Sequence, residues 1–170
     1  MALVALAVAL GVAPGGTQAA TSPAFSIAAA NQLERPVLVE VNRVRRDHGL
    51  GPLRASSQLG AAADAHSRAM GRFGFFAHES RDGSPFHERI ARFYEPGGGG
   101  WSVGENLLWS TPGLDARAAV ELWMRSPGHR KNILTPRWRE IGLSAVSVSA
   151  APGVFGGRDV VIITTNFGVR

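Results

Sequence analysis

The sequence predicts an α+β fold in which helices cover both faces of a small β-sheet. Segments with helical periodicity are concentrated in residues 34–125, whereas residues 141–148 and 160–165 have the composition of strands. Every residue of 160–165 is β-branched, which is typical of a strand that is buried on both faces. Helices from the first part of the chain must therefore lie on both sides of the sheet, which gives the domain three layers.

Two helices are expected in the first half of the chain. Residues 34–48 have Pro36 in the first turn and Gly49 available to end the helix. Their apolar face consists of Val37, Val41 and Val44. This valine-rich composition also permits a strand. Residues 56–73 begin with Ser56 as a candidate cap. Their stripe at helical spacing consists of Leu59, Ala62, Ala63, His66, Met70 and Phe73.

Two further helices are expected before the strands. Ser84 is a candidate cap and Pro85 a candidate first position of a short helix. The apolar face of that helix consists of Phe86, Ile90 and Phe93. Residues 96–100, which are rich in glycine, predict a flexible loop. The last expected helix covers residues 114–125, and its inward-facing residues are Ala116, Ala119, Val120 and Trp123.

The overall composition is that of a single folded domain. The chain has 170 residues, of which 45% are hydrophobic and 18% charged. The absence of cysteine excludes disulfides, thiolate metal sites and a cysteine nucleophile. The net charge of +5 is compatible with an anionic partner, and equally with a genome that prefers arginine codons. Because the basic residues are scattered, we expect no nucleic-acid binding.

Residues 1–30 are predicted to be a signal peptide or an N-terminal anchor, and residues 31–170 the folded domain. Residues 1–30 contain no charged residue, and an apolar stretch is followed by small residues. Candidate cleavage sites are Thr17-Gln18-Ala19 and Ala28-Ala29-Ala30. The positively charged leader of a typical signal is missing. No stretch has the roughly 20 uninterrupted apolar residues that a spanning helix needs, so no transmembrane segment is expected beyond this region.

The residues best suited to metal binding or catalysis are two histidines and a glutamate. His78, Glu105 and His129 lie in segments predicted to be loops. Imidazole nitrogens and carboxylate oxygens are ordinary zinc ligands, so the three side chains are candidates for a divalent cation site. The spacing alone is weak evidence, because the ligands would have to converge through the fold. The alternative is that Glu105 only accepts hydrogen bonds that hold a loop. His66, on an apolar helical stripe, is expected to be a core histidine.

Around these residues the chain resembles the CAP superfamily, also called the SCP or PR-1-like family, in its bacterial secreted form. The resemblance runs from about residue 37 to residue 167. It rests on motifs in a fixed order, among them Gly104-Glu105-Asn106-Leu107, Trp123-Met124, residues 126–134 and residues 164–168. The resemblance implies a three-layer α-β-α sandwich with a mainly antiparallel sheet, and an extracellular or cell-envelope location.

The resemblance also implies a cleft with two histidines and two glutamates that binds a divalent cation, zinc in the first place. Matched by motif, the metal ligands are His78, Glu105 and His129. At the position of the second glutamate this sequence has Ser126. Glu121 precedes Trp123 and points the other way on the expected helix, where i, i+4 spacing suits ion pairs with Arg117 and Arg125. Ser126 and Glu121 are therefore only possible site residues.

The favoured functional interpretation is an exported binding module. Its cleft would hold a divalent cation, a small lipid or other hydrophobic ligand, a peptide or a cell-wall fragment. One alternative is a metal-assisted hydrolase with Glu105 as the catalytic base, although the sequence has neither a Gly-x-Ser-x-Gly nor a His-Glu-x-x-His motif. A second alternative is a protein that binds an anionic envelope component through its arginines, with an affinity that decreases as salt increases.

Overall fold

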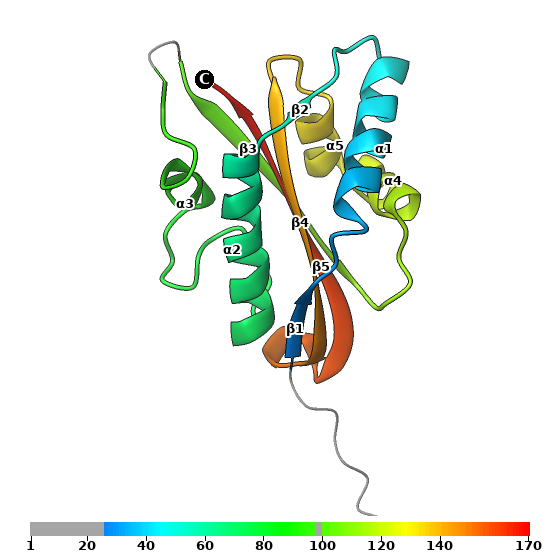
Figure 1. The fold of residues 1–170 in the computed structure, drawn as a ribbon, viewed down its shortest axis with the longest axis vertical. Coiled ribbons are helices and arrows are strands. Elements are labelled where there is room, and N and C mark those ends of the chain that lie inside the picture. Colours follow the sequence, from blue (N-terminus) through cyan, green and yellow to red (C-terminus); the bar gives the residue numbers. More distant parts are fainter. Residues whose placement is uncertain (1–25, 98–99) are drawn as a thin grey trace, which may run out of the picture.

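The structure is a computed structural model that describes residues 26–97 and 100–170 (Figure 1). Most of the predicted signal or anchor segment, residues 1–30, lies outside the described residues, and that interpretation stays a prediction. Its last part is described, and Ser26–Ala29 form strand β1 of the sheet. The predicted glycine-rich loop at residues 96–100 is described only in part.

The centre of the domain is a five-stranded, mainly antiparallel sheet. The strands after β1 are β2 (Arg54–Ala55), β3 (Ser102–Ser110), β4 (Glu140–Ala151) and β5 (Arg158–Val169). Their order is β1-β4-β5-β3, and β2 pairs in parallel with β4 while the other pairs are antiparallel. Strand β3 therefore ends the sheet on the side opposite β1.

Helices cover both faces of this sheet, as predicted. Helices α2 (Ser57–Phe73) and α3 (Phe86–Ala91) lie on one face. Helices α1 (Glu34–Asp47), α4 (Ala116–Arg125) and α5 (Pro127–Ile133) lie on the other (Figure 1). The short 3₁₀ helix η1 (Gly153–Phe155) connects β4 and β5. Within the described part of the chain, no helix is both long enough and apolar enough to cross a bilayer.

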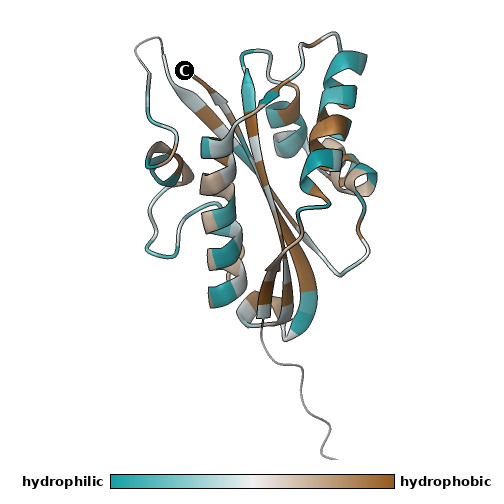
Figure 2. Cartoon of the chain, viewed as in Figure 1, coloured by the Kyte–Doolittle hydropathy of each residue, from teal (hydrophilic) through white to brown (hydrophobic). Residues whose placement is uncertain are grey.

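The core has a layer on each side of the sheet because strand residues alternate between its faces. On β5, Val161, Ile163 and Phe167 pack toward α1 and α4, while Val160 and Ile162 pack toward α2. All five are buried, which confirms that this β-branched strand is covered on both sides. Figure 2 shows the resulting hydrophobic stretches along the central strands, and hydrophilic residues on the helices.

Local capping chemistry accounts for the helix boundaries. The Ser56 hydroxyl accepts a hydrogen bond from the backbone N–H of Leu59, which confirms it as the cap of α2. Gly74 ends the helix in the left-handed conformation, with φ of 68°. The predicted cap of α3 is wrong by one residue. Pro85 occupies that position, because the Ser84 side chain is turned back to donate to Asp82.

Three other expectations are corrected by the structure. The Gly-Glu-Asn-Leu motif lies on strand β3 and not in a loop, and its polar residues hide the strand pattern. Residues 127–133 form helix α5, which is too short for a clear periodic signal. Helical spacing puts Phe73 and Phe93 on inward faces, but they are 46% and 36% exposed. Phe73 is the last residue of α2, and Phe93 lies beyond the end of α3.

A buried arginine fixes the position of α5. Arg45 of α1 is only 1% exposed and donates to the backbone carbonyls of Gly51, Ile133 and Thr135. Burial lowers the pKa of its guanidinium. Because two of the three acceptors lie at the end of α5, Arg45 ties that helix to α1.

The close approach of α2 to β4 leads to the first prediction. A Cβ atom on Gly142 would overlap the backbone of Leu59 and Gly60, which cannot move without shifting the helix. Gly142→Ala is therefore expected to lower the free energy of unfolding by about 3 kcal/mol in urea denaturation. The matched control is Gly51→Ala, where a Cβ meets no atom within 4 Å. An equal effect of the two substitutions would contradict this packing account.

Candidate functional site

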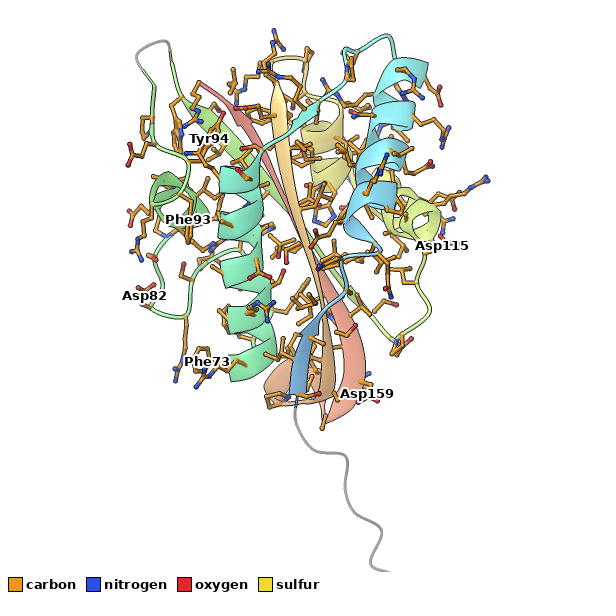
Figure 3. All side chains as sticks on the ribbon, in the orientation of Figure 1. Phe73, Asp82, Phe93, Tyr94, Asp115 and Asp159 are labelled. Carbon is orange, nitrogen blue, oxygen red and sulfur yellow. The ribbon has the colours of Figure 1, made fainter. Side chains whose placement is uncertain are left out.

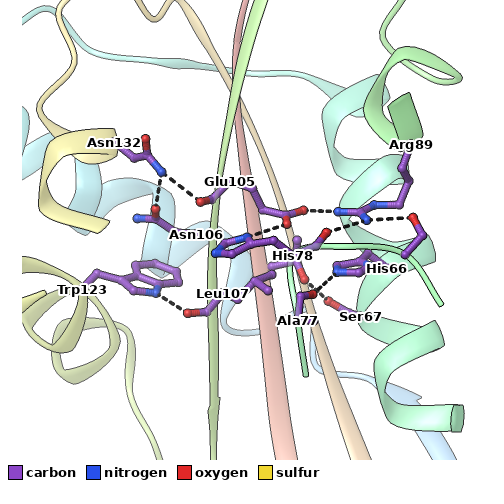
Figure 4. Close-up of polar contacts among 12 residues, drawn as sticks. His66, Ser67, Ala77, His78, Arg89, Glu105, Asn106, Leu107, Trp123 and Asn132 are labelled. Atoms are coloured by element: carbon purple, nitrogen blue, oxygen red, sulfur yellow. Dashed lines mark hydrogen bonds and ion pairs between the residues drawn. The ribbon is translucent and has the colours of Figure 1, made fainter. Parts of the chain in front are cut away.

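The candidate site is a cleft of about 520 Å³ beside strand β3. Three of the predicted site residues, His78, Glu105 and His129, line this cleft, and so does Ser126. His78 belongs to the loop that follows α2, Glu105 to β3, and His129 to α5. Residues that are far apart in the sequence therefore line one cleft at the edge of the sheet. Figure 4 shows His78 and Glu105 with their polar contacts.

Glu105 is at the centre of the polar contacts. Its side chain has no exposed surface, and its Oε1 atom lies 3.0 Å from Nδ1 of His78. The Oε2 atom accepts a hydrogen bond from Arg89 of α3 in a buried ion pair (Figure 4). A buried carboxylate without partners is strongly unfavourable. Arg89 and His78 together satisfy both oxygens, so the carboxylate is held in one orientation.

Arg89 also holds the loop that carries His78. Its Nη1 atom donates to the backbone carbonyl of His78 at 3.1 Å and to the hydroxyl of Ser80 at 3.2 Å. Because the same guanidinium binds Glu105, it fixes His78 relative to β3. Sequence patterns did not predict this arginine as a site residue.

The opposite wall of the cleft is tied to β3 through Asn106. Its amide nitrogen donates to the backbone carbonyl of His129 at 3.1 Å, and its side-chain oxygen accepts from Asn132 at 2.9 Å. Asn132 donates also to the backbone carbonyl of Glu105 at 2.9 Å. Trp123 of α4 donates to the carbonyl of Leu107 at 3.0 Å. The Glu-Asn-Leu motif thus connects β3 with α4 and α5. Asn106 and Asn132 had no predicted role of their own.

His129 is half-buried at this wall, and its surroundings favour the neutral imidazole. Burial lowers its pKa from 6.5. A neutral imidazole is the form that binds metal ions.

His66 is a core histidine, as the sequence predicted. It is 1% exposed, and its Nε2 atom lies 2.9 Å from the backbone carbonyl of Ala77, next to His78. Its ring packs edge-on against Phe75. Burial is the main cause that lowers the pKa of His66, and the charge of Arg89 lowers it further.

Glu121 lies away from the cleft. It forms ion pairs with Arg117 at 3.0 Å and with Arg125 at 3.8 Å, as the helical spacing indicated. It lines a different groove, between α1 and α4.

The contacts of Glu105 decide how these residues fit a metal ion. Among the described residues, no group of three histidine, cysteine, aspartate or glutamate side chains is arranged to hold one. Both oxygens of Glu105 are engaged by His78 and Arg89. The nitrogen donors that remain are Nε2 of His78 and the ring of His129. The arrangement fits Glu105 as the residue that orients an imidazole ligand, and its role as a direct ligand stays a prediction.

The buried ion pair gives the second prediction. Glu105→Gln leaves Arg89 buried without a carboxylate, and is expected to cost about 3 kcal/mol of unfolding free energy. The control Glu121→Gln changes the same charge at an exposed pair and is expected to cost less than about 1 kcal/mol. Urea denaturation of both variants measures the difference. Similar losses of unfolding free energy in the two variants would show that the ion pair with Arg89 does not stabilise the buried Glu105.

Acid sensitivity is the third prediction. Below pH 6.5 an unfolded chain protonates His66, while the folded protein with its lowered pKa does not. The unfolding free energy therefore falls as the pH decreases from 7 to 5, by at most about 1.4 kcal/mol per pH unit for each such histidine. His129 acts in the same direction. His66→Gln, which retains a hydrogen-bond donor, is expected to flatten the slope. An unchanged slope in this variant, equal to that of the exposed control His87→Gln, would refute the assignment.

Comparison with known proteins identifies relatives of the chain. The YkwD protein of Bacillus subtilis strain 168 is 34% identical over 135 residues, which cover 76% of this chain and 48% of YkwD. The membrane protein YlbC of the same strain is 31% identical over 110 residues, covering 65% of this chain and 30% of YlbC. The chain thus spans less than half the length of these relatives.

Solved structures share the fold. An extracellular SCP-domain protein from Bacillus anthracis strain Ames is 26% identical with a TM-score of 0.64, and the match covers 82% of this chain and 41% of that protein. An outer surface protein of Borrelia burgdorferi has a TM-score of 0.66 at 17% identity, over 86% of this chain and 99% of its own.

The family model agrees with both comparisons. The model described as the cysteine-rich secretory protein family, CAP, matches residues 38–164, although this chain contains no cysteine. The matched segment includes α2, α3, β3, α4, α5 and β4, and therefore all the residues of the candidate site. The chain belongs to the CAP superfamily.

Proposed function

We propose that this protein is an exported binding module whose cleft beside β3 holds a divalent cation through the imidazoles of His78 and His129. The observation that carries the proposal is the 3.0 Å contact between Nδ1 of His78 and the buried carboxylate of Glu105. A carboxylate that accepts the N–H of one ring nitrogen leaves the other nitrogen as a metal ligand, and this pairing is common around protein-bound zinc. When bound, the cation supplies an electrophilic centre for an anionic ligand.

The protein's own residues keep the two imidazoles in place. Arg89 fixes Glu105 and the His78 loop, and Asn106 fixes the backbone at His129. The side chain of His78 is 44% exposed, so it is accessible from the cleft. Such a site is held by two layers of the sandwich, one on each side of β3.

The remaining lining of the cleft supports a ligand that is anionic at one end and apolar at the other. Lys131 and Arg137 contribute positive charge, and Phe86 and Trp138 contribute aromatic rings. A small lipid, the carboxyl end of a peptide and an acidic cell-wall fragment all have this combination. Export is supported by the charge-free segment at residues 1–30 and by the extracellular B. anthracis relative.

The buried position of Glu105 supports a binding role over catalysis with this residue as the base. A general base needs an oxygen within reach of the proton that it removes. Both oxygens of Glu105 are occupied, and its side chain has no exposed surface.

Calorimetric titration of the full chain with zinc tests the proposal. We expect binding in the parent protein and a loss of at least about tenfold in affinity in His78→Ala/His129→Ala, because the donor nitrogens are removed. The matched control is His48→Ala/His87→Ala, two exposed histidines outside the cleft. No zinc binding in the parent, or equal losses in the two double variants, would reject the site.

A further inference from the structure

A second pocket lies between α2 and α3, and it is separate from the β3 cleft. Its volume is about 320 Å³. Helix α2 contributes Ala65, His66 and Ala69, and the other lining residues are Ser80, Arg81, Arg89, Arg92 and Phe93. Figure 3 shows the side of the molecule on which it lies, where Phe73, Asp82 and Phe93 are labelled. The cleft and this pocket have no lining residue in common.

Three arginines face this pocket, and two of them are available to a ligand. Arg81 and Arg92 are exposed, and neither forms an ion pair with a carboxylate among the residues that the structure describes. Asp82 is the acidic neighbour of Arg81, but its Oδ1 atom accepts hydrogen bonds from the backbone N–H and the hydroxyl of Ser84. No direct ion pair engages the two exposed guanidiniums in the described part of the chain, and the Asp82 carboxylate interacts with Arg92 only at longer range.

The third arginine, Arg89, has one side-chain N–H group that the contacts described above do not use. The side chain of Arg89 is 8% exposed, and its two Nη atoms are used by Glu105, the His78 carbonyl and Ser80. Its Nε atom is buried and has no hydrogen-bond partner among the described residues. An unsatisfied buried donor is unfavourable, and it invites an added acceptor.

One aromatic side chain lines the pocket, and a second stacks on one of its arginines. Phe93 lines the pocket and is 36% exposed, and Phe73, at the end of α2, is 46% exposed. The guanidinium of Arg81 lies 4.1 Å from the centre of the Phe73 ring. Exposed aromatic rings beside unpaired arginines suit an anion that is attached to an apolar group.

We propose that the pocket between α2 and α3 binds a phosphate-type oxyanion through the charges of Arg81 and Arg92 and the unused Nε–H group of Arg89, whose own charge is paired with Glu105. Guanidinium groups match the geometry of phosphate oxygens, and their charge strengthens the hydrogen bonds that they donate. The Nε atom of Arg89 is shielded from solvent, so the two exposed arginines make the first contacts. The phosphate is either free or the headgroup of a lipid, and the exposed Phe93 in the pocket favours the headgroup.

The test measures two probes with the full chain: inorganic phosphate by calorimetry, and phosphatidylglycerol vesicles by flotation. Arg81→Gln/Arg92→Gln is expected to weaken binding at least about tenfold, since two charged hydrogen-bond donors are lost. Arg117→Gln/Arg125→Gln removes the same charge from the opposite helical layer and serves as the control. A second pair of variants leaves the arginines unchanged. Ala65→Glu inserts a carboxylate into the pocket, whereas Ala65→Gln inserts a group of the same size without charge.

The outcomes separate the sources of the phosphate and decide the proposal. Phosphate binding that is lost only in the pocket variants supports a site for the free anion. Vesicle binding that is lost in the same variants, without binding of inorganic phosphate, supports a site for a lipid headgroup. The proposal is overturned if neither probe binds the parent protein. It is also overturned if the pocket variants and their controls lose binding equally, because the net charge alone would then explain it.

Discussion

The candidate site depends on one buried carboxylate. Glu105 has no exposed surface, and its two oxygens are divided between the guanidinium of Arg89 and the imidazole of His78. A carboxylate in this position is tolerated only when it is paired, so the position of β3 depends on both α3 and the loop after α2. The same pairing sets the orientation of His78. The stability of the domain and the geometry of its cleft thus rest on the same contacts.

The alternation of side chains along β3 extends this constraint to the other half of the molecule. Glu105 contacts α3 and the His78 loop, while its neighbour Asn106 contacts α5 on the opposite face. A cleft at the end of the sheet is in this way lined from both helical layers. Arg89 has a further consequence, because it also lines the pocket between α2 and α3. A single guanidinium therefore lies between the proposed cation site and the proposed anion site.

Much of the fold could be predicted from local patterns. The structure confirms the cap at Ser56, the stripe of α2 as far as Met70, and the β-branched strand at residues 160–165. Strand β3 could not be found in this way, because its polar residues are buried by partners that come from distant parts of the chain. The positions of His78, Glu105, His129 and Ser126 in one cleft followed from the family resemblance. The role of Arg89 did not, since a buried ion pair between α3 and β3 leaves no local signature in the sequence.

Nitrogen NMR of the imidazole rings in the folded protein tests the central claim most directly. The account predicts that neutral His78 carries its proton on Nδ1, where Glu105 accepts it, and that its Nε2 resonance is the one that shifts when zinc is added. In Glu105→Gln the preference for this tautomer should be lost. A proton on Nε2 of His78 in the parent protein, or a tautomer that is indifferent to the loss of the carboxylate, would contradict the claim that Glu105 orients the site.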